Sequence, residues 1–122
     1  MRKNFKIFVY GTLKKGFSNH HYLSDSKFLG DAETVEKYVM YIKDNIPFVS
    51  EREKVSRIQG EIYSVTKNTL KRIDLLEENT LWYNRKEVKV KFKKSCKIVE
   101  AWLYFNEYEK GYIEKSGFFN LK

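Results

Sequence analysis

The chain has 122 residues, 42% of them apolar and 16% aromatic, which is enough for one domain with one hydrophobic core. No apolar run approaches the ~18 to 20 residues of a membrane-spanning helix, and the basic N-terminus lacks the pattern of a signal peptide. Cys96 is the only cysteine, which excludes an internal disulfide and favours a reducing compartment. We therefore expect one cytoplasmic domain over residues 1–122, with no membrane partner.

The net charge of +8 raises the possibility of nucleic-acid binding. Of the 24 basic residues, however, 19 are lysines, whereas bidentate recognition of phosphates and bases uses arginine. The densest lysine cluster, residues 86–97, alternates with Val88, Val90 and Phe92. This alternation is typical of a half-buried strand with a solvated lysine face. We therefore predict no nucleic-acid partner.

The strand-like segments are rich in β-branched and aromatic residues. In chain order they are residues 6–10, 38–42, 60–65, 87–92 and 98–105. Pro47, which follows the second segment, cannot donate a main-chain hydrogen bond and must lie in a turn or on a sheet edge.

One strong helical pattern covers residues 66–78. Thr66 is a suitable N-cap, and Leu70, Ile73 and Leu76 recur at helical spacing. A second, shorter helix is expected around residues 19–24. Strands combined with one principal helix predict a single small α+β domain, with flanking helices on a mixed or antiparallel sheet that could curl into a barrel.

The turn after the first strand, Val-Tyr-Gly-Thr-Leu-Lys-Lys-Gly at residues 9–16, is the first candidate site. Gly11 lets the backbone bend and approach another group closely, and successive main-chain N–H groups in such a turn can bind an anion. The spacing of Gly11 and Gly16 half-matches a phosphate loop, but Phe17 stands where the phosphate-binding lysine belongs. A purely structural turn and a binding turn both remain open from this pattern alone.

Glu77 is the second candidate. At about 100° per residue it falls roughly 20° from Leu70 and 40° from Ile73, on the face that should point into the core. Desolvation there would raise its pKa toward neutrality, as a general base requires. Alternatively, Glu77 ends the apolar stripe or pairs with Arg85. Glu78 lies about 100° further round and can reach water.

Three other residues carry weaker signals. His20 and His21 are adjacent, so their side chains diverge, and without a further histidine we predict no metal site. Cys96 is flanked by lysines, which could lower its pKa, but a buried unreactive thiol is the favoured interpretation.

Several segments, taken together, resemble a known family. They are residues 9–16 followed by Asn19 and His20, residues 45–48, residues 60–65, and the series from Leu70 through Glu77 to residues 83–85. In this order and spacing they resemble the γ-glutamylcyclotransferase-like (AIG2-like) proteins, in particular the γ-glutamylamine cyclotransferase branch. Residues 117–120 add only a weak similarity.

The resemblance implies a barrel-like mixed sheet with flanking helices and a γ-glutamyl cyclotransferase activity that releases 5-oxoproline from a small γ-glutamyl substrate. It implies that Glu77 is the catalytic base, that no cofactor is used, and that the glutamyl group binds to Tyr10, Gly11, Thr12 and Leu13. Asn19, Tyr83 and Arg85 are candidate pocket residues. A non-catalytic member that binds a small ligand or a protein is the alternative, and a basic nucleic-acid module ranks third.

Overall fold

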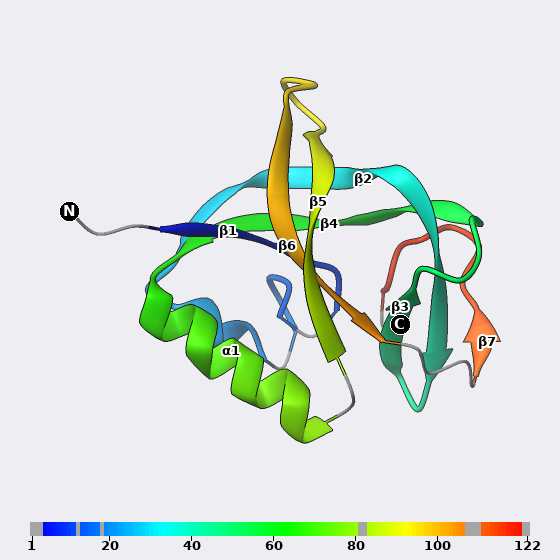
Figure 1. The fold of residues 1–122 in the computed structure, drawn as a ribbon, viewed down its shortest axis with the longest axis horizontal. Coiled ribbons are helices and arrows are strands. Elements are labelled where there is room, and N and C mark those ends of the chain that lie inside the picture. The colour runs from blue at the N-terminus through cyan, green and yellow to red at the C-terminus, as the bar shows by residue number, and fades with distance from the viewer. Residues whose placement is uncertain (1–3, 12, 18, 81–82, 107–110, 121–122) are drawn as a thin grey trace.

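The computed structural model describes residues 4–11, 13–17, 19–80, 83–106 and 111–120, and for residues 77–80 and 83 it describes the backbone only. Figure 1 shows a curved sheet with one α-helix packed along its outside. In chain order the elements are β1 (Phe5–Val9), the 3-10 helix η1 (His20–Leu23), β2 (Lys27–Lys43), β3 (Ile46–Ser50), β4 (Ser56–Val65), α1 (Lys67–Thr80), β5 (Tyr83–Phe92), β6 (Ile98–Asn106) and β7 (Tyr112–Ile113).

The sheet closes on itself. Its strand order is β3-β2-β4-β1-β6-β5, and β5 also pairs with β2, so that five of these strands form a barrel. β1 runs parallel to β6, with Ile7 opposite Trp102, whereas its other neighbour, β4, is antiparallel. The predicted α+β class with a mixed, barrel-like sheet is therefore confirmed.

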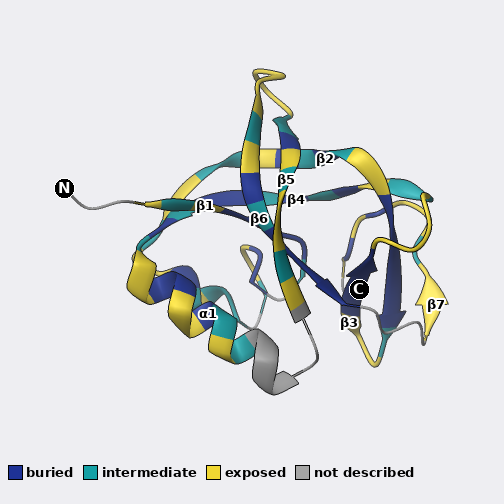
Figure 2. Ribbon diagram, in the orientation of Figure 1, coloured by how far each residue is buried: buried dark blue, intermediate teal, exposed yellow. Residues whose placement is uncertain are grey.

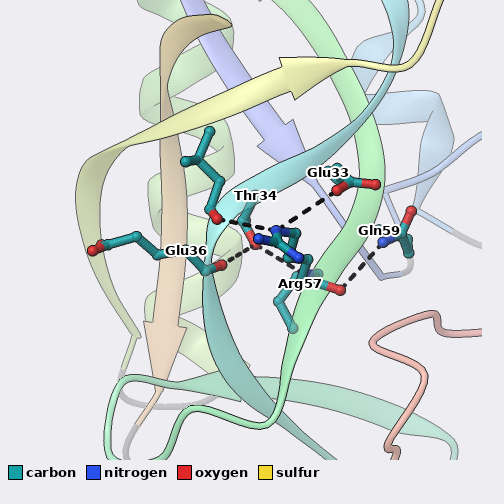
Figure 3. Close-up of polar contacts among 7 residues, drawn as sticks. Glu33, Thr34, Glu36, Arg57 and Gln59 are labelled. Carbon is teal, nitrogen blue, oxygen red and sulfur yellow. Dashed lines mark hydrogen bonds and ion pairs between the residues drawn. The ribbon is translucent and has the colours of Figure 1, made fainter. Parts of the chain in front are cut away.

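β2 is much longer than the segment 38–42 that the sequence predicted. Its first half pairs with β4 and β5, and its second half leaves the barrel to pair with β3 and β7. The register shifts between Glu33 and Lys37, where the strand bends. Thr34 satisfies the main chain at this bend, because its hydroxyl accepts from Ile58 N at 2.9 Å and donates to Glu36 O at 2.7 Å (Figure 3).

Arg57 of β4 contacts the same bend of β2 through its side chain. Its Nε donates to Val35 O at 3.2 Å and lies 3.9 Å from Glu33 Oε2, while Gln59 Nε2 donates to Arg57 O at 3.3 Å (Figure 3). At this bulge the ladder of main-chain hydrogen bonds is interrupted, and the side chains of Thr34 and Arg57 bond to main-chain groups in its place.

The hairpin between β2 and β3 places Pro47 at the edge of the sheet. Asp44 and Asn45 both have positive φ, 53° and 61°, as the two central residues of a type I′ turn require. Pro47 lies opposite Ile42 in β3, the terminal strand of the sheet order. Of the two positions predicted for Pro47, a turn or a sheet edge, the structure has the edge.

α1 begins where the sequence predicted. Thr66 Oγ1 accepts from Thr69 N at 3.3 Å, which is the hydrogen bond of an N-cap. Leu70 and Ile73 are buried against Ile7 and Val9 of β1, on the outer face of the barrel. The second helix is also present, as the single 3-10 turn of η1.

The buried residues, dark blue in Figure 2, form two main clusters. One fills the barrel and includes Phe8, Met40 and Leu103, and the other lies between the barrel and α1. Since side chains alternate along β1, Phe8 points into the barrel, whereas Ile7 and Val9 point toward the helix. No helix in the described part of the chain is long and apolar enough to cross a membrane.

The β5–β6 hairpin projects from the barrel, at the top of Figure 1, and carries the lysine cluster. Val90 is buried while Lys89 and Lys93 are exposed, which confirms the predicted solvated face. Cys96 lies in the turn of this hairpin, is exposed and has a φ of 60°. The expectation of a buried cysteine is therefore wrong, because the residue serves the turn rather than the strand.

Candidate functional site

The turn that follows β1 is closed by its own main chain and anchored at its first residue. Lys14 N donates to Gly11 O at 3.0 Å. The Tyr10 side chain is buried in the barrel, and its hydroxyl donates to Tyr104 O of β6 at 2.8 Å. Leu13 is buried on the other side, in the cluster beneath α1. The turn thus straddles the end of the barrel, with one side chain in each part of the core.

Gly11 is required for close packing rather than for an unusual backbone angle. Its φ lies outside the left-handed region, but a Cβ at this position would come within 2.8 Å of Pro47 Cγ. The backbone at Gly11 thus approaches another group closely, and that group is the buried ring of Pro47 at the edge of the sheet.

The far half of the turn is held by polar side chains. Glu61 Oε1 accepts from Lys15 N and from the Tyr63 hydroxyl, each at 2.9 Å. Burial, followed by the hydrogen bond that Tyr63 donates to Glu61, raises the pKa of Tyr63 well above its ordinary value. His20 Nδ1 lies 3.0 Å from Leu13 O, and since a carbonyl only accepts, this nitrogen carries the proton. The sequence predicted only that His20 is not a metal ligand, and the structure adds that it supports the turn.

Lys14 ties the turn to the C-terminal segment. Its side chain is buried, with 3% exposed, and Nζ donates to Phe119 O at 2.5 Å. The ammonium also lies over the rings of Phe17, Phe118 and Phe119, at 4.9, 4.3 and 5.8 Å from their centroids. Burial lowers the pKa of Lys14 below its ordinary value, although Glu61 and Asp31 act in the opposite direction.

A polar cluster joins α1 to the two strands beyond the turn. Asp74 of α1 accepts from Arg85 through both carboxylate oxygens, at 3.0 and 3.1 Å, and from the Tyr104 hydroxyl at 2.5 Å. The Arg85 guanidinium also lies 4.3 Å from the ring centre of Trp102. Arg85, a candidate pocket residue, therefore has Asp74 as its partner, a residue for which the sequence predicted no role.

The structure describes the remaining candidate residues only in part. Glu77 lies in α1, one turn after Asp74, and the helix face that it was predicted to share is buried at Leu70 and Ile73. The side chains of Glu77 and Tyr83, and all of Thr12, are outside the described residues.

Asn19, another candidate pocket residue, is half-buried at the N-cap of η1, and its main-chain oxygen accepts from Tyr22 N at 3.1 Å. Among the residues the structure describes, no three His, Cys, Asp or Glu side chains form a potential metal site.

Comparison with known proteins identifies the family. The model of the family described as "Gamma-glutamyl cyclotransferase, AIG2-like" matches residues 7–120. The chain belongs to this family. A Methanocaldococcus jannaschii protein, named as a proposed gamma-glutamylcyclotransferase, is 51% identical over 112 residues, which cover 91% of this chain and 92% of that protein. Gamma-glutamylaminecyclotransferase B of Danio rerio is 37% identical over 121 residues, covering 89% of this chain and 63% of the fish protein.

Solved structures of the AIG2-like family have the same fold. The mouse AIG2-like protein superposes with a TM-score of 0.75 at 29% identity, covering 85% of this chain and 78% of the mouse chain. An uncharacterized Pyrococcus horikoshii protein gives a TM-score of 0.73 at 33% identity, covering 94% and 89% of the two chains. Together with the family match over residues 7–120, these coverages show that the similarity extends beyond the blocks that the sequence had matched.

Proposed function

We propose that this member of the family is an active γ-glutamyl cyclotransferase that releases 5-oxoproline and a free amine, with Glu77 as general base. The observation that supports the proposal most is the restraint of the turn at residues 10–16. Its main chain or side chains are held at Tyr10, Leu13, Lys14 and Lys15 by β6, His20, the C-terminal segment and β4. A turn fixed at so many points is prepared to hold a flexible substrate in one conformation.

The chemistry requires orientation above all. A γ-glutamyl compound carries its own nucleophile, the α-amino group, which is mostly protonated at neutral pH. Glu77 removes a proton from this group, and the nitrogen attacks the γ-carbonyl carbon to close a five-membered lactam. The bond from the γ-carbonyl carbon to the amide nitrogen breaks. The leaving nitrogen takes the proton held by Glu77 and the second proton given up by the attacking nitrogen, so the products are a neutral lactam and a protonated amine. Main-chain N–H groups near Gly11 stabilise the substrate carboxylate or the developing oxyanion.

Glu77→Gln and Glu78→Gln form a matched pair that tests the base. Both replace a glutamate of α1 by an amide of nearly the same size, and only the first is predicted to share the buried face. Glu77→Gln should lower the rate of 5-oxoproline release by at least ~10²-fold, the low end of general-base contributions, whereas Glu78→Gln should leave it nearly unchanged. Equal rates in the two variants would rule out Glu77 as the base.

Within this activity we propose a γ-glutamylamine, such as γ-glutamyl-lysine isopeptide, as the substrate class. Support comes from the Danio rerio relatives named gamma-glutamylaminecyclotransferases, at 37 and 38% identity. The net charge of +8 gives no general attraction for a cationic leaving group. Any attraction must therefore come from local side chains, for which Glu78, Trp82 and Tyr83 are the candidates.

Competition between substrates tests this class. The isopeptide, glutathione and γ-glutamyl-alanine would be offered at equal concentration and 5-oxoproline release measured for each. The highest kcat/KM is expected for the isopeptide. A higher value for either competitor would overturn the γ-glutamylamine assignment and leave the cyclotransferase mechanism standing.

A further inference from the structure

Tyr104 lies between α1 and the turn at residues 10–16 and is hydrogen-bonded to both. Its hydroxyl donates to Asp74 of α1 at 2.5 Å, and its main-chain oxygen accepts from the Tyr10 hydroxyl at 2.8 Å. Arg85, directly opposite Tyr104 in the β5–β6 ladder, binds the same carboxylate. We propose that Asp74, Arg85 and Tyr104 form a positioning network that sets the rotation of α1 relative to the turn, an inference that rests on the proposed role of Glu77.

The network holds Asp74 in a defined orientation. Two parallel N–H···O bonds from one guanidinium fix the plane of a carboxylate, which a single ion pair does not. The side chains of Asp74 and Arg85 are 30% and 27% exposed, so water competes little with these bonds. The Trp102 ring, 4.3 Å from the guanidinium, in turn holds Arg85. Asp74 is therefore bound to two strands of a closed barrel.

The other contacts of α1 are less directional. Leu70 and Ile73 pack on the barrel through apolar surface, and such packing specifies orientation weakly, since similar shapes can repack. A carboxylate about 6 Å from a helix axis moves by ~1 Å for a rotation of roughly 10°. A misplacement of about 1 Å at a reacting group can cost ~10²-fold in rate. Apolar packing alone therefore does not fix the position of the Glu77 carboxylate closely enough for catalysis.

Asp74 lies at a position from which its hydrogen bonds can prevent this rotation of α1. It precedes Glu77 by three residues, so the two occupy neighbouring positions on the same side of α1, about one turn apart. Fixing the direction of Asp74 therefore fixes the direction in which position 77 projects. Because Tyr104 also holds Tyr10, the residue before Gly11, a single strand sets the spacing between the helix and the turn.

The test uses Tyr104→Phe and Asp74→Asn in the full chain. Tyr104→Phe removes only the hydroxyl and keeps the buried ring, and Asp74→Asn removes the charge that binds Arg85. We expect kcat for 5-oxoproline release to fall ~10- to 100-fold, as for a displacement of up to about 1 Å, with KM changed less than about threefold. Loss of folded protein would also lower the apparent kcat at constant KM, so each rate is divided by the folded fraction measured by urea unfolding at the assay temperature. A loss of kcat that remains after this normalisation reports misplacement of the base.

Asp25→Asn is the matched control. It removes another ion pair of the same helix, with Arg72 at 3.9 Å, in which both side chains are more than half exposed. Its kcat should equal that of the wild type. If Asp74→Asn does not fold, Tyr104→Phe alone tests the positioning network. A wild-type kcat in Tyr104→Phe overturns the proposal.

Amide hydrogen exchange in α1 separates this inference from the proposed function. We expect faster exchange in residues 67–80 of both network variants and unchanged exchange in β1 and β4. A wild-type protein that releases no 5-oxoproline would refute the proposed function alone. Unchanged exchange in α1 of the two variants would overturn the positioning network even in an active enzyme.

Discussion

Gly11→Ala is expected to damage the turn through a single contact. The added Cβ would lie 2.8 Å from Pro47 Cγ and 3.5 Å from Pro47 Cδ. Carbon atoms pack comfortably at about 3.5 to 4.0 Å, so one of the two groups must retreat by ~0.7 to 1.2 Å. Pro47 is buried, rigid and paired in register with Ile42, and the turn is therefore the part that moves. Overpacking of this size costs about 1 to 3 kcal/mol of folding free energy.

The effect on activity should exceed the effect on stability. A turn displaced by about 1 Å presents its main-chain groups out of place, and we expect kcat/KM for 5-oxoproline release to fall ~10²-fold. Urea unfolding gives the free energy of the variant, and rates measured where it is fully folded give the catalytic effect.

The double variant Gly11→Ala/Pro47→Ala provides the decisive comparison. Removing the proline ring gives the new methyl group room, so the double variant should recover at least about 1 kcal/mol relative to the sum of the single changes. It should also recover much of the lost kcat/KM. Additive losses in both quantities would refute the reasoning, because they would mean that contact with Pro47 is not what makes glycine necessary at position 11.

Two further predictions concern buried ionisable groups. Burial, reinforced by Glu36, raises the pKa of Tyr38 to about 12. The wild type should therefore lose stability relative to Tyr38→Phe as the pH rises from 10 to 12. Urea unfolding of both proteins at the two pH values measures this loss. Burial lowers the pKa of Lys14, so its charged form opposes folding at neutral pH and this penalty fades as the pH approaches 10.5. The stability of the wild type relative to Lys14→Met should therefore increase between pH 8 and 10, and a flat difference would contradict the burial of a charged amine.

Local patterns in the sequence predicted the elements whose stability is local. The spacing of Leu70 and Ile73 and the cap at Thr66 were sufficient to place α1, because helix hydrogen bonds and caps join near neighbours. Residues 27–37 of β2 were missed, since their polar and glycine positions resemble a loop. They form a strand because β4 and β5, which come later in the chain, pair with them from both sides.

The same distinction explains which residues the sequence could suggest for the candidate site. Gly11 and Glu77 stand out by residue type and by position in a pattern. Asp74 and Lys14 do not, because their partners Tyr104 and Phe119 lie 30 and 105 residues away. In sequence, a lysine or an aspartate with many charged neighbours is expected on the solvated surface, whereas the fold buries Lys14 and half-buries Asp74. Long-range polar contacts of this kind carry almost no local signal.

The central position of β1 has a consequence for how the protein is made. This strand is synthesised before the other strands of the sheet, yet it pairs with β4 on one side and with β6, more than 80 residues later, on the opposite side. During translation its apolar residues must wait without a complete set of partners, exposed to other nascent chains. Contacts between distant segments also form slowly, because a long loop must close first. The turn that follows β1 can therefore take its final shape only after the ribosome has released β6, so interrupted synthesis before residue 98 yields a chain with neither barrel nor site.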